Sequence, residues 1–514
     1  MSEPLLGGPR LLVPTERQRA VGDEADYRDL PPVEVTGPPA HESRRGRLTG
    51  WARDLDPRTI DGPKLVLLVL CLTSVFARID EQAIGVLLPQ IRADLGVNTT
   101  FLATVAAVAG ILLTIALLPL GYLADRVSRV WLVRSGTLLT GTTIGLTGLA
   151  TSAIMLVGAR LANGVSQAIA QPATFPLMAD YFPPRGRARV FSVFFAAAQL
   201  GVIAGPVVAG LLGDAIGWRA TLLLLGGGAV VAGLLTFLMR EPRRGTFDTP
   251  DPGATLPPAP SFGEAYRAAA RVATLRRFWY ATPFVNSRGT FGLLLLPFFL
   301  SEVYQVTVRQ LGFILGLNGV TGMIGLLIAG PVGAFLLRDR PGRFMTVLGF
   351  APVVQALVIV VISLRPPLPV AIAVLQVSVI CEVIGQPGGL TLISYVVPAR
   401  VRGLGMQTTV PWQLVNLISL PFLVAAMQGF GMQHGILLLV PLLVIGGLIL
   451  ATGAPGVERD MRAARAADAA DAASRDAAGS TLLVCRDVDV EYDGVPVLFG
   501  VDLDIAEAGR TRRP

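Results

Sequence analysis

Twelve long apolar stretches recur along this chain of 514 residues, and they limit what it can fold into. A helix crosses the hydrocarbon core of a bilayer with about 20 apolar residues. The chain is 52% hydrophobic and only 15% charged, which is more apolar than a soluble domain can cover with polar surface. We therefore predict an all-α membrane protein with twelve transmembrane helices, at roughly 64–91, 101–124, 130–150, 153–178, 189–213, 219–239, 278–304, 309–337, 344–364, 368–396, 403–428 and 434–454.

Arginines in the short connections indicate the orientation. An even number of spans places both termini on one side, and cytoplasmic connections carry the excess of arginine. The even-to-odd connections and their edges hold Arg126, Arg129, Arg134, Arg185, Arg187, Arg189, Arg240, Arg243, Arg244, Arg338, Arg340, Arg343, Arg400 and Arg402. The opposite connections hold few, among them Arg92, Arg219, Arg309 and Arg365. We therefore expect a multi-pass protein of the cell (inner) membrane with both termini in the cytoplasm.

The same bias accounts for the formal net charge of +7, so we expect no nucleic-acid partner. The three cysteines, Cys71, Cys381 and Cys485, are scattered, and the two histidines, His41 and His434, are isolated. Such spacing indicates neither a disulfide framework nor a metal or haem site. We expect no cofactor and no enzymatic activity. The expected partners are the lipid bilayer and a small-molecule substrate.

Two stretches that lie six helices apart match at one offset. "QPATFPLMADYFPPRGR" begins at Gln171, and "QPGGLTLISYVVPARVR" begins at Gln386. At the common offset of 215, Gln171, Pro172, Pro183, Arg185 and Arg187 match Gln386, Pro387, Pro398, Arg400 and Arg402. This repeat predicts two pseudo-symmetric six-helix halves, at 63–240 and 278–454. The sequence "LLP" recurs at an offset of 208, which places Arg288 opposite Asp80 across a central cavity.

A loop motif stands between the second and third predicted helices. The stretch "GYLADRVSRVWLV" contains Gly121, Asp125, Arg126 and Arg129. It resembles the loop signature of the major facilitator superfamily, although a serine and a valine here replace that signature's second glycine and its lysine. The resemblance implies the fold of that superfamily, and it implies secondary transport by alternating access.

A second motif lies in the fifth predicted helix. The stretch "GVIAGPVVAG" contains Gly201, Gly205, Pro206 and Gly210. It is similar to a helix-5 pattern that the superfamily associates with antiporters. Small residues at this spacing also occur in membrane helices for packing alone, so both interpretations stay open.

Several stretches resemble the spinster-type branch, among them "FARIDEQAIGVLLPQIRADLGV" and "LPFFLSEVYQVTVRQLGF". This resemblance implies an amphiphilic or lipid-like substrate. Members of that branch usually carry Asp-Arg in the first helix, whereas the pair here is Asp80-Glu81. Only Asp80 therefore matches the branch.

Ionisable residues interrupt the apolar helices, where each costs about 2.5 kcal/mol or more and usually marks a function. They are Arg78, Asp80, Glu81, Arg160, Arg288 and Glu382. They fall on helices 1, 4, 7 and 10, which line the cavity in the superfamily resembled. Two pairings stay open: Asp80 or Glu81 with Arg160 and Arg288 with Glu382 inside each half, or Asp80 with Arg288 across the halves.

A carboxylate that loses its arginine in a dry site binds a proton more readily. Our hypothesis is that Asp80, with Glu81 as second candidate, couples proton movement to substrate exchange. The alternative is that these charges are permanent ion pairs that hold helices together. A substrate site could include Arg78 and the polar residues Gln167, Gln199, Asn286, Trp412, Gln413 and Asn416, each of which could instead bridge helices.

The flanking segments have other compositions. Residues 1–62 are rich in proline, glycine and charge, which is typical of a disordered cytoplasmic arm. Residues 241–277 are expected to form a cytoplasmic central loop with a basic helix. Residues 455–480 predict an alanine-rich helical linker.

Residues 481–514 alternate polar and apolar side chains as strands do, and they resemble the opening strands of an ABC-type ATPase. No lysine follows Thr481, so the glycine-rich phosphate loop is missing. We expect a remnant of a truncated or frameshifted fusion, for which a separate ABC ATPase is a candidate partner.

These patterns predict a secondary active transporter of a small amphiphilic or hydrophobic molecule, proton-coupled and working by alternating access. Proton antiport and efflux are the expected mode. The alternative is a non-transporting membrane receptor or anchor subunit derived from a fusion with an ATPase.

Overall fold

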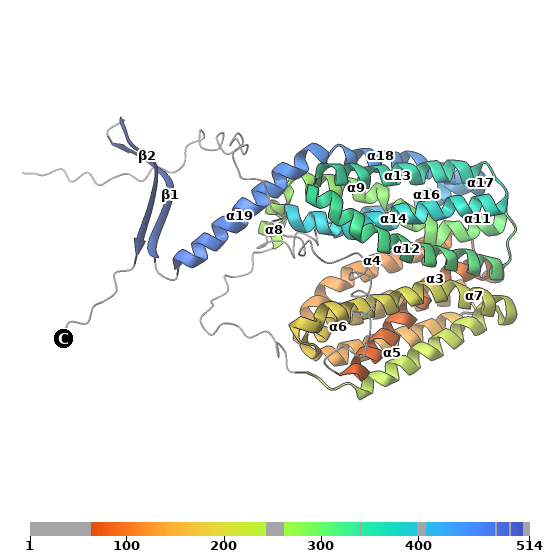
Figure 1. Cartoon of the computed structure of the whole chain (residues 1–514). Coiled ribbons are helices and arrows are strands. Elements are labelled where there is room, and N and C mark those ends of the chain that lie inside the picture. Colours follow the sequence, from red (N-terminus) through yellow and green to blue (C-terminus); the bar gives the residue numbers. More distant parts are fainter. Residues whose placement is uncertain are drawn as a thin grey trace, which may run out of the picture. The chain divides into compact units, whose positions relative to one another are not determined.

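The computed structural model describes residues 63–124, 126–242, 262–339, 341–397, 408–478, 481–492 and 495–506. Within these ranges the chain is nearly all helical, and long helices pack against one another (Figure 1). The first six-helix half is formed by α3 (Lys64–Leu95), α4 (Thr99–Ala124), α5 (Arg129–Gly148), α6 (Ala153–Tyr181) and α7 (Pro184–Leu235), with the short turn η3 (Thr236–Leu238) at its end.

Helix α7 contains two membrane spans in one continuous element. The sequence predicted two helices, at 189–213 and 219–239, and the structure joins them at a kink instead of a loop. The kink lies at Gly217, whose φ of 76° is a left-handed conformation that side chains other than glycine rarely adopt. The helix also begins earlier than predicted, because Pro184 at its first turn needs no hydrogen-bond acceptor for a backbone N–H.

The second half begins with a broken helix. Its parts are α9 (Ala273–Val285), α10 (Ser287–Thr290), the π-helical turn η4 (Phe291–Leu295) and α11 (Leu296–Val303). The remaining helices of this half are α12 (Val308–Asp339), α13 (Pro341–Ser363), α14 (Leu368–Val396), α16 (Val410–Gly429), α17 (Gly431–Gly435), η6 (Ile436–Leu438) and α18 (Leu439–Ala451). The predicted start at 278 was therefore late, and the predicted continuous helix is interrupted.

Further elements flank the second half. Helix α8 (Phe262–Arg271) precedes α9, and the turn η7 (Ala454–Gly456) leads into α19 (Val457–Ala478). Strands β1 (Thr481–Tyr492) and β2 (Val495–Ala506) pair antiparallel, as the alternating pattern predicted. The remnant interpretation of these strands stays a prediction. The predicted arm at 1–62 and most of the central loop lie outside the described residues.

The described helices carry the apolar surface of a membrane protein. Eight spans in the described ranges are long and apolar enough to cross a bilayer by length and composition. Helices α3 and α5 are not among these eight spans, although both are long enough. Helix α3 carries the buried charges, and α5 is rich in threonine, so both are less apolar. Counting α7 twice and α9 to α11 once, the elements form twelve spans in two halves of six, as predicted.

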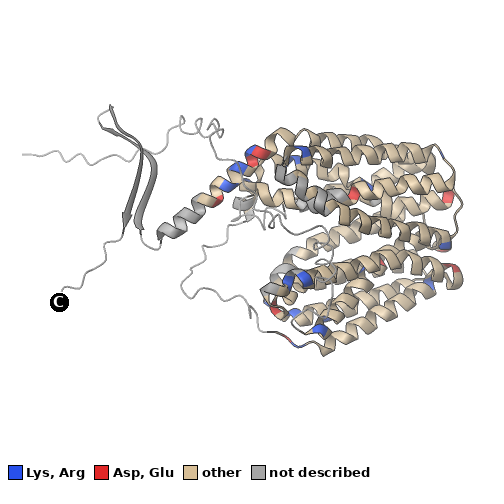
Figure 2. Cartoon of the chain, in the orientation of Figure 1, with Lys and Arg blue, Asp and Glu red and all other residues tan. Residues whose placement is uncertain are grey.

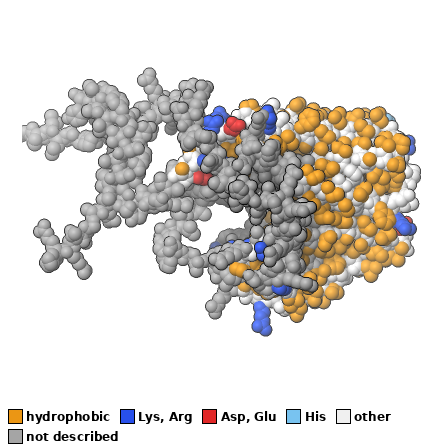
Figure 3. Space-filling model, in the orientation of Figure 1, with side chains coloured by type: hydrophobic (Ala, Val, Ile, Leu, Met, Phe, Trp, Pro, Cys, Tyr) orange, Lys and Arg blue, Asp and Glu red, His pale blue; other side chains and the backbone are white. Residues whose placement is uncertain are grey.

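Hydrophobic side chains cover the visible face of the helical region (Figure 3), whereas charged residues are sparse along the middle of the helices (Figure 2). Large apolar side chains such as Leu68, Phe350 and Phe422 are more than half exposed, at 63%, 62% and 74%. In water such exposure would be unfavourable, so this surface is suited to contact with lipid.

The two halves contact each other mainly through α7 with α12 and α4 with α16. A Cβ added at Gly210 would lie 2.7 Å from the Cα of Gly312, so glycine is required where these two helices cross. Near the middle of the other pair, Gly110 packs against Leu417. At the end where α3 finishes, Arg92 pairs with Glu302 of α11, and Thr100 donates a 2.9 Å hydrogen bond to Gln428.

Candidate functional site

Asp80 lies in the middle of α3 and is buried, with 1% of its side chain exposed. Nη2 of Arg160, on α6, lies 3.3 Å from Oδ1 of Asp80. The other carboxylate oxygen, Oδ2, is buried and has no hydrogen-bond partner among the described residues. A buried carboxylate is expensive unless it is fully paired, so Asp80 is held by less than a complete set of donors.

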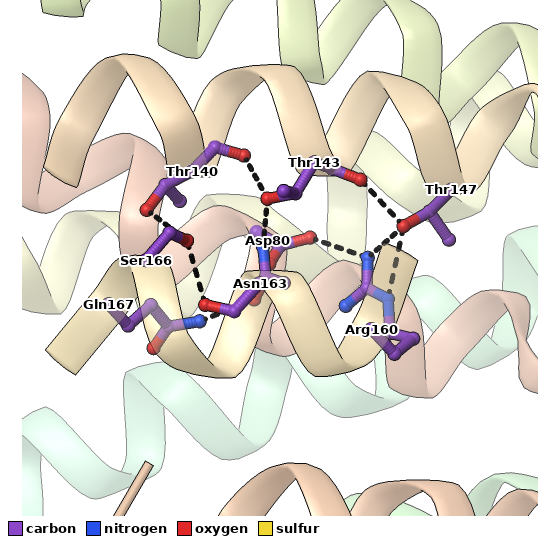
Figure 4. A network of polar contacts seen from close by, with 8 residues as sticks. All are labelled: Asp80, Thr140, Thr143, Thr147, Arg160, Asn163, Ser166 and Gln167. Atoms are coloured by element: carbon purple, nitrogen blue, oxygen red, sulfur yellow. Dashed lines mark hydrogen bonds and ion pairs between the residues drawn. The ribbon is translucent and has the colours of Figure 1, made fainter. Parts of the chain in front are cut away.

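Arg160 is shared between two acceptors. Its Nε and Nη2 also donate to Oγ1 of Thr147, at 3.2 and 3.1 Å, which is slightly closer than the carboxylate (Figure 4). Thr147 is fully buried on α5 and donates in turn to the backbone oxygen of Thr143. The guanidinium therefore has a second partner in reach when it turns away from Asp80.

The polar network continues along the contact between α5 and α6 (Figure 4). Asn163 donates to Oγ1 of Thr143 at 3.1 Å, and Gln167 donates to Oδ1 of Asn163 at 2.7 Å. The hydroxyl groups of Thr140 and Ser166 lie 2.9 Å apart. Gln167, predicted as a candidate substrate contact, thus belongs to a chain of hydrogen bonds inside the first half.

Arg78 and Glu81 form a separate pair one turn apart on α3. Nη1 of Arg78 lies 2.6 Å from Oε2 of Glu81, and both side chains are about half exposed, at 49% and 40%. They therefore lie on a different face of α3 from buried Asp80. No described contact joins either residue to Arg160.

The helix-5 glycines bring α7 close to this part of α3. A Cβ at Gly201 would lie 2.6 Å from the backbone oxygen of Val75 and 2.8 Å from Cβ of Arg78. A Cβ at Gly205 would lie 3.1 Å from the Cα of Ile79. These glycines therefore set the distance between the two helices beside the charged residues, while Pro206 and Gly210 pack against α12.

In the second half, Arg288 and Glu382 form an ion pair between α10 and α14. Arg288 is nearly buried, with 10% of its side chain exposed, whereas Glu382 is 32% exposed. Arg288 lies at the break in the seventh span, between α9 and the π-helical turn. Such turns are frequent at functional sites because they disturb the regular backbone hydrogen bonds. The structure therefore pairs the charges within each half, and no described contact joins Asp80 to Arg288.

A cavity of about 460 Å³ opens beside this pair. Five of the predicted residues line it: Asn286, Arg288, Glu382, Gln413 and Asn416. Asn416 also donates to the backbone oxygen of Pro283 at 3.1 Å, so it bridges α16 and α9 as well. Apolar side chains complete the wall, among them Phe278, Leu348, Leu417 and Leu450.

Two other predicted substrate residues do not line this cavity. Gln199 donates to the backbone oxygen of Gly319 at 3.1 Å and so joins α7 to α12. Trp412 packs in an aromatic cluster, with its ring 5.2 Å from Tyr280 and 6.3 Å from Trp279. Both residues bridge helices in the structure.

The structure describes only part of the loop signature, because Asp125 and the packing around Gly121 lie outside the described residues. Arg126 is exposed. Arg129 forms an ion pair with Asp180, at the end of α6. Sequence reasoning did not single out Asp180, although it lies within the repeated stretch on which the two halves were aligned.

Glu241 was also missed. Its carboxylate accepts hydrogen bonds from the hydroxyl of Ser128 at 2.6 Å and from the backbone N–H groups of Arg129 and Val130 at 2.8 and 2.9 Å. It thereby caps the N-terminus of α5 from the far end of the first half. The only feature of Glu241 visible in the sequence was that it is an acidic residue just after the predicted helix 219–239.

Other missed residues are Gln355, Thr282 and Cys381 in the cavity wall, and the pair Arg92 and Glu302 between the halves. Gln355 lies in the predicted helix 344–364, which is not one of helices 1, 4, 7 and 10 that were expected to line the cavity. No feature of the sequence therefore pointed to it. Arg92 was counted only as a residue of a connection.

The family model described as the Major Facilitator Superfamily matches residues 70–410. This match covers most of the membrane region and agrees with two halves of six spans. The chain belongs to the major facilitator superfamily.

Relatives in this superfamily are distant. A protein of Escherichia coli named "Probable L-galactonate transporter" is 22% identical over 280 residues, which are 53% of this chain and 62% of the relative. One of Cupriavidus necator, named as a probable sulfoacetate transporter, is 27% identical over 293 residues, 54% of this chain and 65% of the relative. The chain thus spans less than two thirds of these two. An "MFS-type efflux pump" of Mycolicibacterium smegmatis is 26% identical over 59% of this chain and 67% of the pump.

Solved structures show the same fold. A bacterial homologue of the human lysosomal transporter spinster, in an inward-facing and unoccupied conformation, superposes with a TM-score of 0.66 at 19% identity. The match covers 77% of this chain and 97% of that one. A peptide transporter in complex with sulfate superposes with a TM-score of 0.63 at 16% identity, over 77% of this chain and 95% of that one. These likenesses show that the chain has the fold of these transporters.

Proposed function

We propose that this chain is a secondary transporter that exchanges protons for a small amphiphilic molecule by alternating access. We further propose that it resides in the cell (inner) membrane with both termini in the cytoplasm. The observation that carries the proposal is the buried carboxylate of Asp80, which has one arginine contact and one oxygen without a described partner.

The proton step uses the two acceptors of Arg160. While Arg160 contacts Asp80, the guanidinium supplies the counter-charge of the buried carboxylate. When Arg160 is held by Thr147 alone, Asp80 loses this counter-charge in a site of low dielectric, and we infer that a proton takes its place. A movement of α6 relative to α3 of about 1 Å or more would break a contact that is already 3.3 Å long. Glu81 is the second candidate, because its exposed carboxylate is accessible.

The cavity beside Arg288 suits an amphiphilic substrate. Its lining presents a guanidinium, a carboxylate and four amide side chains, together with apolar side chains. A substrate with a polar group and an apolar body would satisfy both surfaces. The names of two relatives include organic anions, L-galactonate and sulfoacetate, and a third is named as an efflux pump. Arg288 is the cavity residue suited to an anionic group.

The contacts between the halves suggest which side is open. The described ion pair between the halves and the hydrogen bond from Thr100 to Gln428 lie in the part of the helices toward Arg92 and Glu302. A further hydrogen bond between the halves, from Gln199 to Gly319, lies nearer the middle of the helices. With both termini in the cytoplasm, the end with Arg92 and Glu302 faces outward, and the arrangement corresponds to an inward-facing state. The helix-5 motif supports antiport, because Gly210 packs α7 closely against α12 of the other half, and these two helices must slide past each other when the halves rock.

A ligand screen tests the substrate part of the proposal. Purified protein is heated with lysolipids, L-galactonate, sulfoacetate, 4-hydroxybenzoate or cationic drugs, and the unfolding temperature is recorded. A ligand at 100 times its dissociation constant adds about 2.7 kcal/mol of stability. We expect one class to stabilise the wild type and Arg309→Ala, an exposed arginine away from the cavity, but not Arg288→Ala. Equal stabilisation of all three proteins would contradict the assigned cavity.

A further inference from the structure

A second cavity, of about 300 Å³, lies where α9 begins and α18 ends. Its wall is formed by Ala273, Arg277, Thr452, Gly453, Pro455, Gly456 and Arg459. The cavity is therefore built from three elements, α9, the turn after α18 and the first turn of α19. Because it lies at the ends of two membrane spans, it is at the level of lipid head groups. It shares no wall residue with the cavity beside Arg288.

Two guanidinium groups enter this cavity from different elements. Nη1 of Arg277 donates to the neutral hydroxyl of Thr452 at 3.1 Å. Nε of Arg459 lies 3.8 Å from Oδ1 of Asp460, and the side chain of Arg459 is 66% exposed. Gly453 leaves room for the aliphatic part of the Arg277 side chain, because a Cβ at Gly453 would lie 3.2 Å from Cγ of Arg277.

Besides the contact of Asp460 with Arg459, the nearby carboxylates have partners outside the cavity. Oδ2 of Asp460 accepts the backbone N–H of Thr274 at 2.7 Å and so caps the start of α9. Glu458 lies 3.9 Å from Arg462, one turn further along α19. Neither carboxylate belongs to the cavity wall. The wall itself therefore carries two positive groups and no negative one.

Exposed arginines surround the same place. Arg267, Arg271 and Arg276 of α8 and α9 are exposed at this end of the bundle. Basic residues at the head-group level attract anionic lipid. Phosphate oxygens accept hydrogen bonds from guanidinium groups in a favourable, often bidentate geometry.

We propose that Arg277 and Arg459 bind the phosphate group of an anionic ligand in this cavity. The phosphate bridges α9 and α19 and holds the start of the C-terminal helix against the membrane region. Two sources share this chemistry, an anionic phospholipid whose acyl chains lie in the bilayer and free inorganic phosphate. This inference does not depend on the proton step or on the substrate cavity.

The test uses the full-length protein purified in detergent. Three probes are added separately: phosphatidylglycerol, phosphatidylcholine with the same acyl chains, and inorganic phosphate. Native mass spectrometry counts retained lipid, and hydrogen exchange follows the backbone amides of 457–465. Arg277→Gln with Arg459→Gln is compared with a control of equal charge, Arg276→Gln with Arg465→Gln, whose residues do not line the cavity.

We expect phosphatidylglycerol to bind the wild type and the control pair and to slow exchange in α19. Because both double variants lose the same surface charge, the cavity pair should bind about 30-fold more weakly than the control pair, as a result of losing the direct hydrogen bonds to phosphate. Arg277→Lys with Arg459→Lys keeps both charges and should retain most of the binding, which separates loss of charge from misfolding. If inorganic phosphate alone gives the same protection, the site takes free phosphate.

The proposal is overturned by any of three results. The first is that none of the probes binds the wild type. The second is that phosphatidylcholine is retained as strongly as phosphatidylglycerol while phosphate has no effect. The third is that the control pair loses as much binding as the cavity pair, which would indicate attraction by the basic surface as a whole.

Discussion

Arg92 of α3 and Glu302 of α11 form an ion pair that joins the two six-helix halves. Arg92 also donates to Oγ1 of Thr99 at 3.1 Å, and its guanidinium lies 4.9 Å from the centre of the Phe298 ring. Each partner of the ion pair is about one third exposed, at 32% and 34%. A pair with this exposure contributes modestly to stability, so in the proposed transport cycle it can close one end of the bundle and still be broken.

Removing this pair should favour opening at that end. We expect Glu302→Gln to shift the conformational equilibrium by about 2- to 5-fold, because a partly exposed pair contributes about 0.5–1 kcal/mol. The measurement is the distance distribution between spin labels at Ala93 and Arg309, which are exposed on opposite halves. An unchanged distribution would contradict the role of the pair in closure.

The helix-5 glycines should be intolerant of side chains. We expect Gly201→Ala to lower stability by about 1–3 kcal/mol, because the new Cβ would lie 2.6 Å from the backbone oxygen of Val75. Gly227→Ala is the matched control on the same helix, since a Cβ there has no neighbour within 4 Å. Thermal unfolding in detergent compares the two variants. Equal unfolding temperatures would mean that the close contact between α7 and α3 does not occur.

Glu241 should stabilise the start of α5. We expect Glu241→Ala to cost about 1–2 kcal/mol, because two backbone N–H groups and the Ser128 hydroxyl lose their acceptor. Hydrogen exchange of the amides at 129–131 should accelerate. Asp214→Asn, which removes an exposed carboxylate, is the control and should leave these amides unchanged. Equal exchange in both variants would show that Glu241 does not cap the helix.

Cys381 should report on occupancy of the main cavity, because it is one of the wall residues. In a protein with Cys71→Ser and Cys485→Ser, we expect a small methanethiosulfonate reagent to inhibit transport and a bound substrate to slow the modification. The further change Cys381→Ser should make transport insensitive to the reagent. Inhibition that persists without Cys381, or modification that substrate does not slow, would place the substrate elsewhere.

Much of the fold could be predicted from the sequence because the bilayer imposes a strong constraint. A length of about 20 apolar residues recurs for each span, and the repeat around Gln171 and Gln386 indicated two halves. The break between α9 and α11 was missed, because Pro283, Gly289 and Gly292 are ordinary residues in membrane helices. The kink at Gly217 was taken for a loop for a similar reason.

The site was predicted less completely. Buried charges are rare enough to be found one by one, so Asp80, Arg160, Arg288 and Glu382 were all identified. Their pairing could not be settled, because an error of four residues in a helix boundary moves a side chain by about 6 Å. Cavity walls depend on side chains from several helices at once, and for that reason Gln355 and Cys381 carried no recognisable signal.

The central claim is that Asp80 carries the coupled proton, and transport by Asp80→Asn in proteoliposomes tests it most directly. Accumulation driven by a pH gradient is measured together with exchange of labelled for unlabelled substrate at equal pH on both sides. Glu81→Gln serves as the matched variant on the same helix. We expect Asp80→Asn to lose accumulation, to keep exchange, and to differ in this from Glu81→Gln. Accumulation by Asp80→Asn at the wild-type level would contradict the claim.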